Sequence, residues 1–253
     1  MRRNLIYPHR SVRSLPLNGA RLTAAVLLSL VLTMAAYWYR APLLARHNQI
    51  SAALLRACDI PTEGSTQVDL FDPIGSAEVV TITVFRLPQQ PVRVAILFVG
   101  AVLVLMGVYA RVELARNFIV FLLVLLFLAA GVMVFSPSSE VTSVEFSQIW
   151  LRGEILVWLL LPWFSAGLLV LLQPTVWPGV IWAVLMQAYG FLWSAVRLAF
   201  CLGVLHFSGL LLMPLLWFTL GLLADVLYIV VFLSLSTRVA GLQAWGRRAY
   251  WQF

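Results

Sequence analysis

Six long apolar runs occupy about half of this chain of 253 residues. In a helix, about 20 apolar residues are enough to cross the hydrocarbon core of a bilayer. Charged residues make up only 11% of the sequence, whereas soluble domains contain roughly 25%. The sequence therefore predicts an all-α polytopic membrane protein with about six transmembrane helices, at Leu22–Tyr39, Val94–Tyr109, Phe118–Phe135, Ile155–Leu172, Val180–Phe207 and Leu210–Leu235.

Three of these runs leave their helix boundaries open. The first follows a basic segment, as in a signal peptide, but no small-residue cleavage site comes after Tyr39, so we predict an uncleaved span. The second is short, and either tilt or the addition of Val92–Arg93 would extend it. The fifth is long, and Gly190 offers a point where it could divide into two half-elements.

The placement of arginine predicts the orientation. All 17 basic residues are arginine. Five precede the first run, two lie between the second and third, and three follow the sixth, whereas the first predicted outer loop carries five more that are balanced by five acidic residues. Because cytoplasmic loops carry an excess of positive charge, we expect a bacterial inner-membrane protein with both termini cytoplasmic. We expect the net charge of +7 to interact with anionic lipid headgroups of the bilayer rather than with nucleic acid. The predicted organisation is a cytoplasmic N-terminus (1–21), a first span (22–39), an extracytoplasmic loop domain (40–92), a five-helix membrane core (93–235) and an interfacial cytoplasmic tail (236–253).

Residues 40–92 form the one sizeable stretch between predicted spans. The first half, APLLARHNQISAALLRA, has apolar spacing close to a helical repeat and predicts an amphipathic helix on the membrane surface. The second half contains SAEVVTITVFRLP, whose alternation and β-branched residues predict a strand or hairpin. PTEGS and DPIGS are turn signals. We expect a small α/β region that serves as a lid or a docking element.

One arginine, Arg197, lies inside the fifth apolar run. A guanidinium at the centre of a bilayer costs about 2.5–3.5 kcal/mol on insertion scales, so it must face protein, water or a partner charge. Two interpretations follow. Either Arg197 belongs to a functional site, or it pairs with Glu154 or Asp225 and joins helices.

Further polar residues gather at a similar predicted depth. In the predicted topology, one outward-facing pocket could be lined by Glu145, Ser147, Arg152, Glu154, Arg197 and His206. Structural explanations exist for these side chains as well. Ser147 suits a helix start, Arg152 and Glu154 suit anchors at the membrane interface, and His206 suits an interfacial hydrogen bond.

The two cysteines, Cys58 and Cys201, fall on opposite sides of a predicted membrane boundary, so no disulfide is expected. Cys201 follows Arg197 by one helical turn, which is either a setting for a reactive thiol or simply a small core position. No Cys or His spacing indicates a metal site, and we expect no cofactor.

The stretch SAVRLAFCLGVLHFSG, residues 194–209, resembles part of the exosortase/archaeosortase family. That family has an Asn-x-x-Arg motif in a late span, and some members continue with His-x-Ser-Gly. Arg197 matches the arginine, and Ser194 stands where the family has asparagine. The later stretch matches at His206, Ser208 and Gly209. Upstream, VEFSQIWLRGE (residues 144–154) lies about where the family places its Ala-Cys-Ser-Gly motif.

The resemblance implies a membrane enzyme that cleaves and transfers proteins bearing a C-terminal sorting signal. A cysteine would attack the substrate carbonyl and the arginine would stabilise the oxyanion. Here no cysteine occurs between residues 58 and 201, and the family's histidine is absent from PLLWFTLGLLAD. The resemblance therefore implies a branch with altered chemistry, or a relative that binds the C-terminal segment of a membrane-anchored protein without cleaving it. The candidate catalytic residues are Arg197, Ser147 and Glu154, and the candidate substrate-binding residues are Arg152, His206 and Asp225.

Two other classes of function stay open. A non-catalytic membrane subunit or scaffold of an envelope or polysaccharide assembly complex fits the few ionisable groups and the lack of a nucleotide motif. Its partners would be other membrane subunits. A transporter or channel would use Arg197 and Asp225 as an ion pair on a permeation path, but the sequence has no inverted repeat and no paired broken helices.

Overall fold

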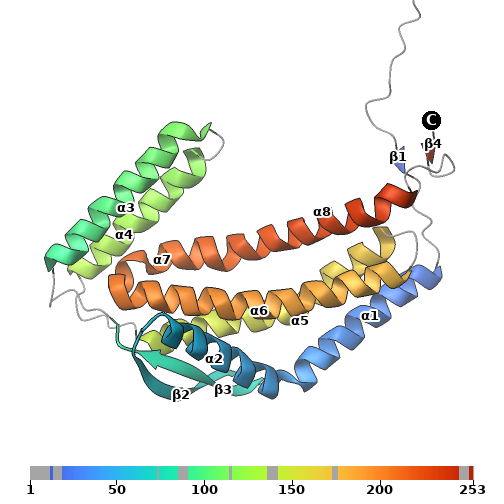
Figure 1. The fold of residues 1–253 in the computed structure, drawn as a ribbon, viewed down its shortest axis with the longest axis horizontal. Coiled ribbons are helices and arrows are strands. Elements are labelled where there is room, and N and C mark those ends of the chain that lie inside the picture. The colour runs from blue at the N-terminus through green and yellow to red at the C-terminus, as the bar shows by residue number, and fades with distance from the viewer. Residues whose placement is uncertain are drawn as a thin grey trace, which may run out of the picture. The chain divides into compact units, whose positions relative to one another are not determined.

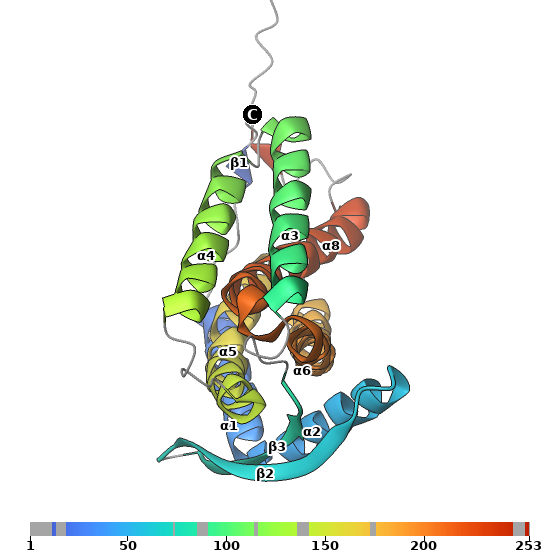
Figure 2. The same cartoon turned by 90° about the vertical axis from the view of Figure 1, so that its left-hand side faces the viewer.

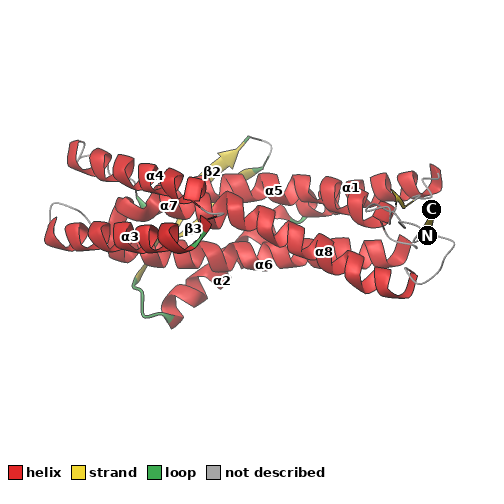
Figure 3. Ribbon diagram, turned by 90° about the horizontal axis from the view of Figure 1, so that it is seen from above, coloured by secondary structure: helices red, strands yellow, loops and turns green. Residues whose placement is uncertain are grey.

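Helices dominate the computed structural model of this chain (Figure 3). Five of the described helices are long and apolar enough to cross a membrane. The chain is therefore a multi-pass membrane protein of the all-α class, as predicted. The structure describes residues 12–13, 19–72, 74–84, 91–113, 116–135, 142–172, 176–244 and 251–252.

The long helices largely cover the apolar runs (Figure 1), but the helix of the fourth run begins at Ser143 rather than Ile155, and the last long helix begins at Ala224, inside the sixth run. Their bounds are Gly19–Trp38 for α1, Pro91–Arg111 for α3, Arg116–Phe135 for α4, Ser143–Leu172 for α5, Val176–Ser208 for α6 and Ala224–Ala244 for α8. The apolar stretch of α4, Arg116–Val132, is shorter than that of the other five. The number of spans, five or six, therefore depends on α4.

The expected division of the fifth run is wrong. Helix α6 continues through Gly190 without a break. A single glycine costs a helix interior only about 1 kcal/mol. Apolar surroundings offer the backbone no other hydrogen-bond partners, so an apolar helix is favoured to continue.

The chain forms two compact units, which are described separately. Unit 1 comprises Met1–Ala36, Trp158–Tyr189 and Leu227–Phe253, and unit 2 comprises Tyr37–Val157 and Gly190–Val226. Helices α5, α6 and α8 each contribute one part to either unit.

Hydrogen bonds to backbone carbonyls near Pro162 join the helices of unit 1. Pro162 lies inside α5, and because proline has no backbone N–H, the carbonyl of Trp158 loses its donor four residues later. The side chain of Gln187, on α6, donates to that carbonyl at 2.9 Å. Two hydroxyls on α1 donate to carbonyls near the same point of α5: Ser29 to Pro162 at 3.1 Å and Thr33 to Leu159 at 3.2 Å.

Close backbone approach and aromatic packing complete unit 1. A Cβ at Gly179, on α6, would lie 2.8 Å from the Cα of Val170 on α5, so only glycine fits there without a shift. On α6 and α8, the ring of Tyr189 lies 5.7 Å from Tyr228 and 5.2 Å from Phe232. Two short strands, β1 (Val12–Arg13) and β4 (Trp251–Gln252), pair antiparallel. The other residues of the predicted cytoplasmic ends, 1–11, 14–18, 245–250 and 253, lie outside the described part of the chain.

In unit 2, helix α2 spans Arg40–Ala57, which confirms the helix predicted there. Asp59 follows with a φ of 55°, and the N–H of Ile60 donates to the carbonyl of Leu55 at 3.0 Å. A left-handed residue followed by this bond is a common helix end. The buried stripe of α2 mixes apolar and polar residues: Leu44, His47, Ser51 and Leu55.

A β-hairpin follows α2 and lies beside it (Figure 2). Strand β2 (Thr62–Phe71) pairs antiparallel with β3 (Gly75–Ile82), so the predicted hairpin is confirmed. The DPIGS turn is also found, because Phe71 pairs with Gly75 across it. The PTEGS turn is wrong: Thr62 already begins β2, and Gly64 sits at an irregularity in the strand register with a φ of 130°. Glycine tolerates this conformation, so the strand continues.

A side chain of α5 hydrogen-bonds to the backbone of the hairpin. The Ser143 hydroxyl accepts from the N–H of Ile82 at 3.1 Å and donates to its carbonyl at 2.9 Å. One apolar cluster joins α2, the hairpin and the two helices, and it includes Leu55, Ile60, Val80, Ile82, Phe146, Trp150, Leu198, Leu202 and Leu205. Unit 2 therefore has a hydrophobic core to which all of these elements contribute.

After α6 the chain passes through irregular helical turns. Gly209, with a φ of 58°, begins a 3₁₀ turn (Gly209–Leu212). The short helix α7 (Met213–Leu216) and a π-helical segment (Trp217–Leu223) lead into α8. Helices α3 and α4 lie side by side (Figure 2), and they pack against the 3₁₀ turn through Val94, Leu126 and Leu211.

Candidate functional site

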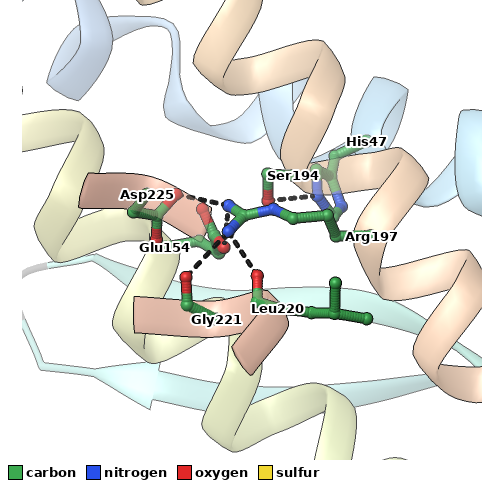
Figure 4. A network of polar contacts seen from close by, with 7 residues as sticks. All are labelled: His47, Glu154, Ser194, Arg197, Leu220, Gly221 and Asp225. Carbon is green, nitrogen blue, oxygen red and sulfur yellow. Dashed lines mark hydrogen bonds and ion pairs between the residues drawn. The ribbon is translucent and has the colours of Figure 1, made fainter. Parts of the chain in front are cut away.

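Unit 2 contains a buried charge network centred on Arg197 of α6 (Figure 4). One guanidinium nitrogen, Nη2, donates to Glu154 Oε1 at 2.8 Å and to Asp225 Oδ1 at 2.5 Å. Glu154 lies on α5 and Asp225 in the first turn of α8. Arg197 is only 2% exposed, and both carboxyl groups are buried with it. The predicted pairing of Arg197 with Glu154 or Asp225 is thus found with both partners at once.

The second guanidinium nitrogen bonds to the backbone. Arg197 Nη1 donates to the carbonyls of Leu220 at 2.5 Å and Gly221 at 2.9 Å. Both carbonyls belong to the π-helical segment. A π-helical turn changes the usual pattern of backbone bonds, and such turns are frequent at functional sites. This irregular turn lets two backbone oxygens face one cation.

Trp150 of α5 also contacts Arg197. The centre of its ring lies 5.6 Å from the guanidinium carbon, a distance at which a cation is attracted to the ring face. Within the described part of the chain, three buried polar atoms here lack a hydrogen-bond partner: Arg197 Nε, Trp150 Nε1 and Ser147 Oγ. Each terminal nitrogen of the guanidinium therefore makes two hydrogen bonds, whereas these three buried atoms make none within the described part of the chain.

A second polar contact lies one turn before Arg197. His47 Nε2, on α2, lies 3.0 Å from the Ser194 hydroxyl on α6, and both side chains are buried. Burial of the ring and the nearby Arg197 charge lower the pKa of His47 from 6.5 to about 4, against an opposing effect of the Ser194 bond. The imidazole is therefore neutral at pH 7.

The remaining candidate residues do not converge on Arg197. Arg152 Nη2 donates to the carbonyl of Asp69 in β2 at 3.0 Å, and its guanidinium lies over the ring of Phe71. His206 Nδ1 lies 2.7 Å from the carbonyl of Thr83, just after β3. Both side chains therefore bond to backbone carbonyls of the hairpin or of the residue just after it. The single outward-facing pocket expected from topology thus divides into a buried network and a set of hairpin contacts.

Glu145 takes part in the hydrogen bonds that begin α5, and Ser147 lies just after them. Thr142 Oγ1 accepts from the N–H of Glu145 at 3.2 Å, and Glu145 Oε2 accepts from the N–H of Thr142 at 3.1 Å. This reciprocal pair is a capping box. Glu145 therefore caps the helix. Ser147 comes two residues later, on the buried side of α5.

The two cysteines lie in different surroundings. Cys201 is buried in the core cluster, and Cys58 is exposed at the end of α2; both are free. Within the described ranges, no group of three or more His, Cys, Asp or Glu side chains could hold a metal ion.

Sequence reasoning missed His47, Ser194 as its partner, and the two backbone carbonyls. His47 and Ser194 are 147 positions apart, so no local pattern connects them. One signal was present: a histidine at the centre of a predicted amphipathic helix, flanked by apolar residues at helical spacing. No comparable signal marks a π-helical turn in an apolar run.

Comparison with protein-family models, with curated proteins and with solved structures finds no match for this chain. The resemblance to exosortases therefore rests on residues 194–209 and the layout of the spans.

Proposed function

We propose that this chain is a non-catalytic membrane subunit, a scaffold whose partners are other membrane proteins of a bacterial envelope assembly. One observation carries the proposal. The guanidinium of Arg197 directs its terminal nitrogens to two carboxyl groups and two backbone carbonyls of its own unit. A cation with its donors committed in this way orders three helices, and it is poorly placed to stabilise an oxyanion on a substrate.

The orientation proposed with it follows the arginine pattern. Both termini lie in the cytoplasm, and residues 40–92 lie on the outer face of the inner membrane. The β-hairpin and α2 then form the surface that partner subunits meet. Support comes from the confirmed helix and hairpin in this region, which give the loop a folded surface of its own.

Native electrophoresis of membranes tests the scaffold proposal. Three proteins are compared: wild type, Arg197→Ala, and a triple variant with Glu154→Met, Arg197→Met and Asp225→Leu. Removing one partner of a buried ion pair is far more damaging than replacing all of its members by apolar residues. We expect wild type and the triple variant to run in a complex with other subunits, and Arg197→Ala to be scarce in the membrane.

Two outcomes contradict the proposal. Wild-type protein that migrates alone after mild detergent extraction has no partners to organise. A triple variant that is abundant and assembled while an exported envelope protein accumulates as its precursor, detected by intact mass, shows that Arg197 has a chemical role.

A second candidate is an exosortase-like processing protein, and it is favoured by the contact between Ser194 and His47. A hydroxyl within 3.0 Å of an imidazole nitrogen, one turn from an arginine, has the composition of a nucleophile with its base. In this case Ser194 would attack the substrate carbonyl in place of the absent cysteine. The substrate would be the C-terminal segment of a membrane-anchored protein.

A fluorophosphonate probe, which forms a covalent bond with activated serines, tests the second candidate. Labelling of wild-type protein that is lost in Ser194→Ala and kept in Ser208→Ala would support it. Ser208 is a suitable control because it is also a buried serine of α6, whose hydroxyl donates to the carbonyl of Val204 at 2.8 Å. Absence of labelling, in a membrane preparation where a known serine hydrolase is labelled, contradicts it.

A further inference from the structure

Strand β2 of the hairpin, the long curved strand in Figure 2, has a neighbouring strand on one side only. Within the described part of the chain, it pairs with β3 in a sheet of two strands. The carbonyl of Asp69 accepts hydrogen bonds from two side chains of α5, Gln148 at 2.5 Å and Arg152 at 3.0 Å. This carbonyl therefore points away from β3, toward the free side of β2.

The free side of β2 stays open toward the start of the strand. In an antiparallel pair, the backbone N–H and C=O groups of residues two apart point to the same side. The register is regular from Gly64 to Asp69, so Gln67 and Ser65 direct these groups outward as Asp69 does. No hydrogen bond among the described residues reaches Ser65 or Gln67 from this side, and residues 63–67 are all exposed. Two N–H and two C=O groups are thus available to a further strand.

Charge indicates which kind of strand fits this edge. The hairpin contains no basic residue, although the chain has a net charge of +7. It carries four acidic side chains, all exposed: Glu63, Asp69, Asp72 and Glu78. Like charges on adjacent strands destabilise their pairing, so β2 of a second copy is disfavoured as the added strand. Anionic lipid headgroups are repelled for the same reason, whereas a segment that carries lysine or arginine is attracted.

We propose that the open edge of β2 binds an extended, basic segment of a partner protein as an added strand. In this mode of recognition, main-chain hydrogen bonds supply affinity and side chains supply selectivity. The inference rests on the scaffold proposal, which makes the hairpin a surface that partner subunits meet, and it adds the chemistry of one such partner. The bound segment is short, because Gln148 and Arg152 already occupy the edge at Asp69.

Peptide binding to the purified full-length protein in a nonionic detergent tests the proposal. The probe is a fluorescent seven-residue peptide in which threonine alternates with lysine, and binding is followed by fluorescence anisotropy. One control peptide has glutamate in place of lysine, and another keeps lysine but is N-methylated along its backbone. We expect the lysine peptide to bind, and both controls to bind at least about tenfold more weakly. Equal binding of the lysine peptide and either control would overturn the proposal.

A proline substitution tests the position of the added strand. Gln67→Pro removes one outward N–H and leaves the bonds to β3, because proline is tolerated where its N–H would face away from the sheet. Gln67→Thr is the matched control, since it keeps the N–H and suits a strand. We expect the lysine peptide to bind about tenfold more weakly to Gln67→Pro and equally well to Gln67→Thr. Equal affinity for both variants contradicts the proposal. Should Gln67→Pro fold poorly, the N-methylated peptide makes the same comparison on wild-type protein.

Failure of this inference can be distinguished from failure of the scaffold proposal. If the lysine peptide does not bind while wild-type protein still runs in a complex on native electrophoresis, the scaffold proposal stands and strand addition is wrong. If the peptide binds to protein that migrates alone, the edge is supported and the scaffold proposal is contradicted. A dimer of the purified protein that Gln67→Pro converts to a monomer, measured by light scattering, would show that a second copy occupies the edge and would overturn the inference.

Discussion

Arg197 shows how a charge survives inside an apolar run. The cost of the guanidinium is offset by two carboxyl groups, two carbonyls and an aromatic face, all supplied within unit 2. Each of these partners is buried or half-buried, so water screens the interactions weakly. The network is then stable only as a set, since every member relies on the others for its partner.

Removing Arg197 alone should be strongly destabilising. In Arg197→Ala, Glu154 and Asp225 lose their cation, and breaking a buried pair in this way costs about 3–5 kcal/mol. Thermal unfolding in detergent should therefore show a large fall in Tm. Arg46→Ala is the matched control, because Arg46 is exposed and bonds to Gln49 alone among the contacts described; we expect a change within about 0.5 kcal/mol. Equal stability of the two variants would show that the network contributes nothing.

At the scale of elements, Pro162 removes one backbone hydrogen bond from α5, and a side chain of α6 replaces it. Pro162 leaves the carbonyl of Trp158 without its intrahelical donor, and Gln187 supplies one. Gln187→Leu should therefore leave a buried carbonyl unsatisfied and destabilise the protein by about 1–3 kcal/mol. The measurement is the unfolding temperature in detergent.

The cause can be isolated with a double-mutant cycle. Pro162→Ala restores the N–H that bonds to the Trp158 carbonyl, so in that background Gln187→Leu should cost less than in wild type. An identical cost in both backgrounds would mean that Gln187 acts through some other contact.

A second element-scale prediction concerns the start of α6. A Cβ at Gly179 would meet the Val170 Cα at 2.8 Å and the Leu169 carbonyl oxygen at 2.9 Å. Both atoms are backbone, so Gly179→Ala must move one helix and should cost about 1–3 kcal/mol. Gly167→Ala on α5 is the control, since nothing lies within 4 Å of its Cβ position, and it should be neutral or stabilising by up to about 1 kcal/mol. The two substitutions are compared by thermal unfolding.

The elements were more predictable than the contacts between them. Apolar length predicted the long helices, and alternation predicted the hairpin, because both signals depend on neighbours in sequence. The continuity of α6 through Gly190 and the start of β2 at Thr62 went against local preferences, which backbone hydrogen bonding overrode. The pairing of Arg197 with carboxylates could be anticipated because buried charges need partners. The contact of His47 with Ser194 could not, because it depends on how α2 docks.

For the whole molecule, the two units differ in how they are stabilised. Unit 1 relies on hydrogen bonds to backbone carbonyls, a close approach at Gly179 and contacts between tilted aromatic rings. Unit 2 combines an apolar core with an internal charge network and a hairpin. Among the described residues of unit 2, α2 and the hairpin carry exposed polar side chains, so the proposed orientation decides on which side of the membrane a partner can reach them.

Cys58 offers a native probe of that orientation. It is exposed at the end of α2, whereas Cys201 is buried, so a membrane-impermeant maleimide should modify Cys58 alone. With residues 40–92 outside, right-side-out vesicles should be labelled at once and inside-out vesicles only after detergent is added. Cys58→Ser should abolish the signal in both preparations. Rapid labelling confined to inside-out vesicles would invert the proposed topology, and an alkaline-phosphatase fusion at residue 75 that stays inactive would agree with that inversion.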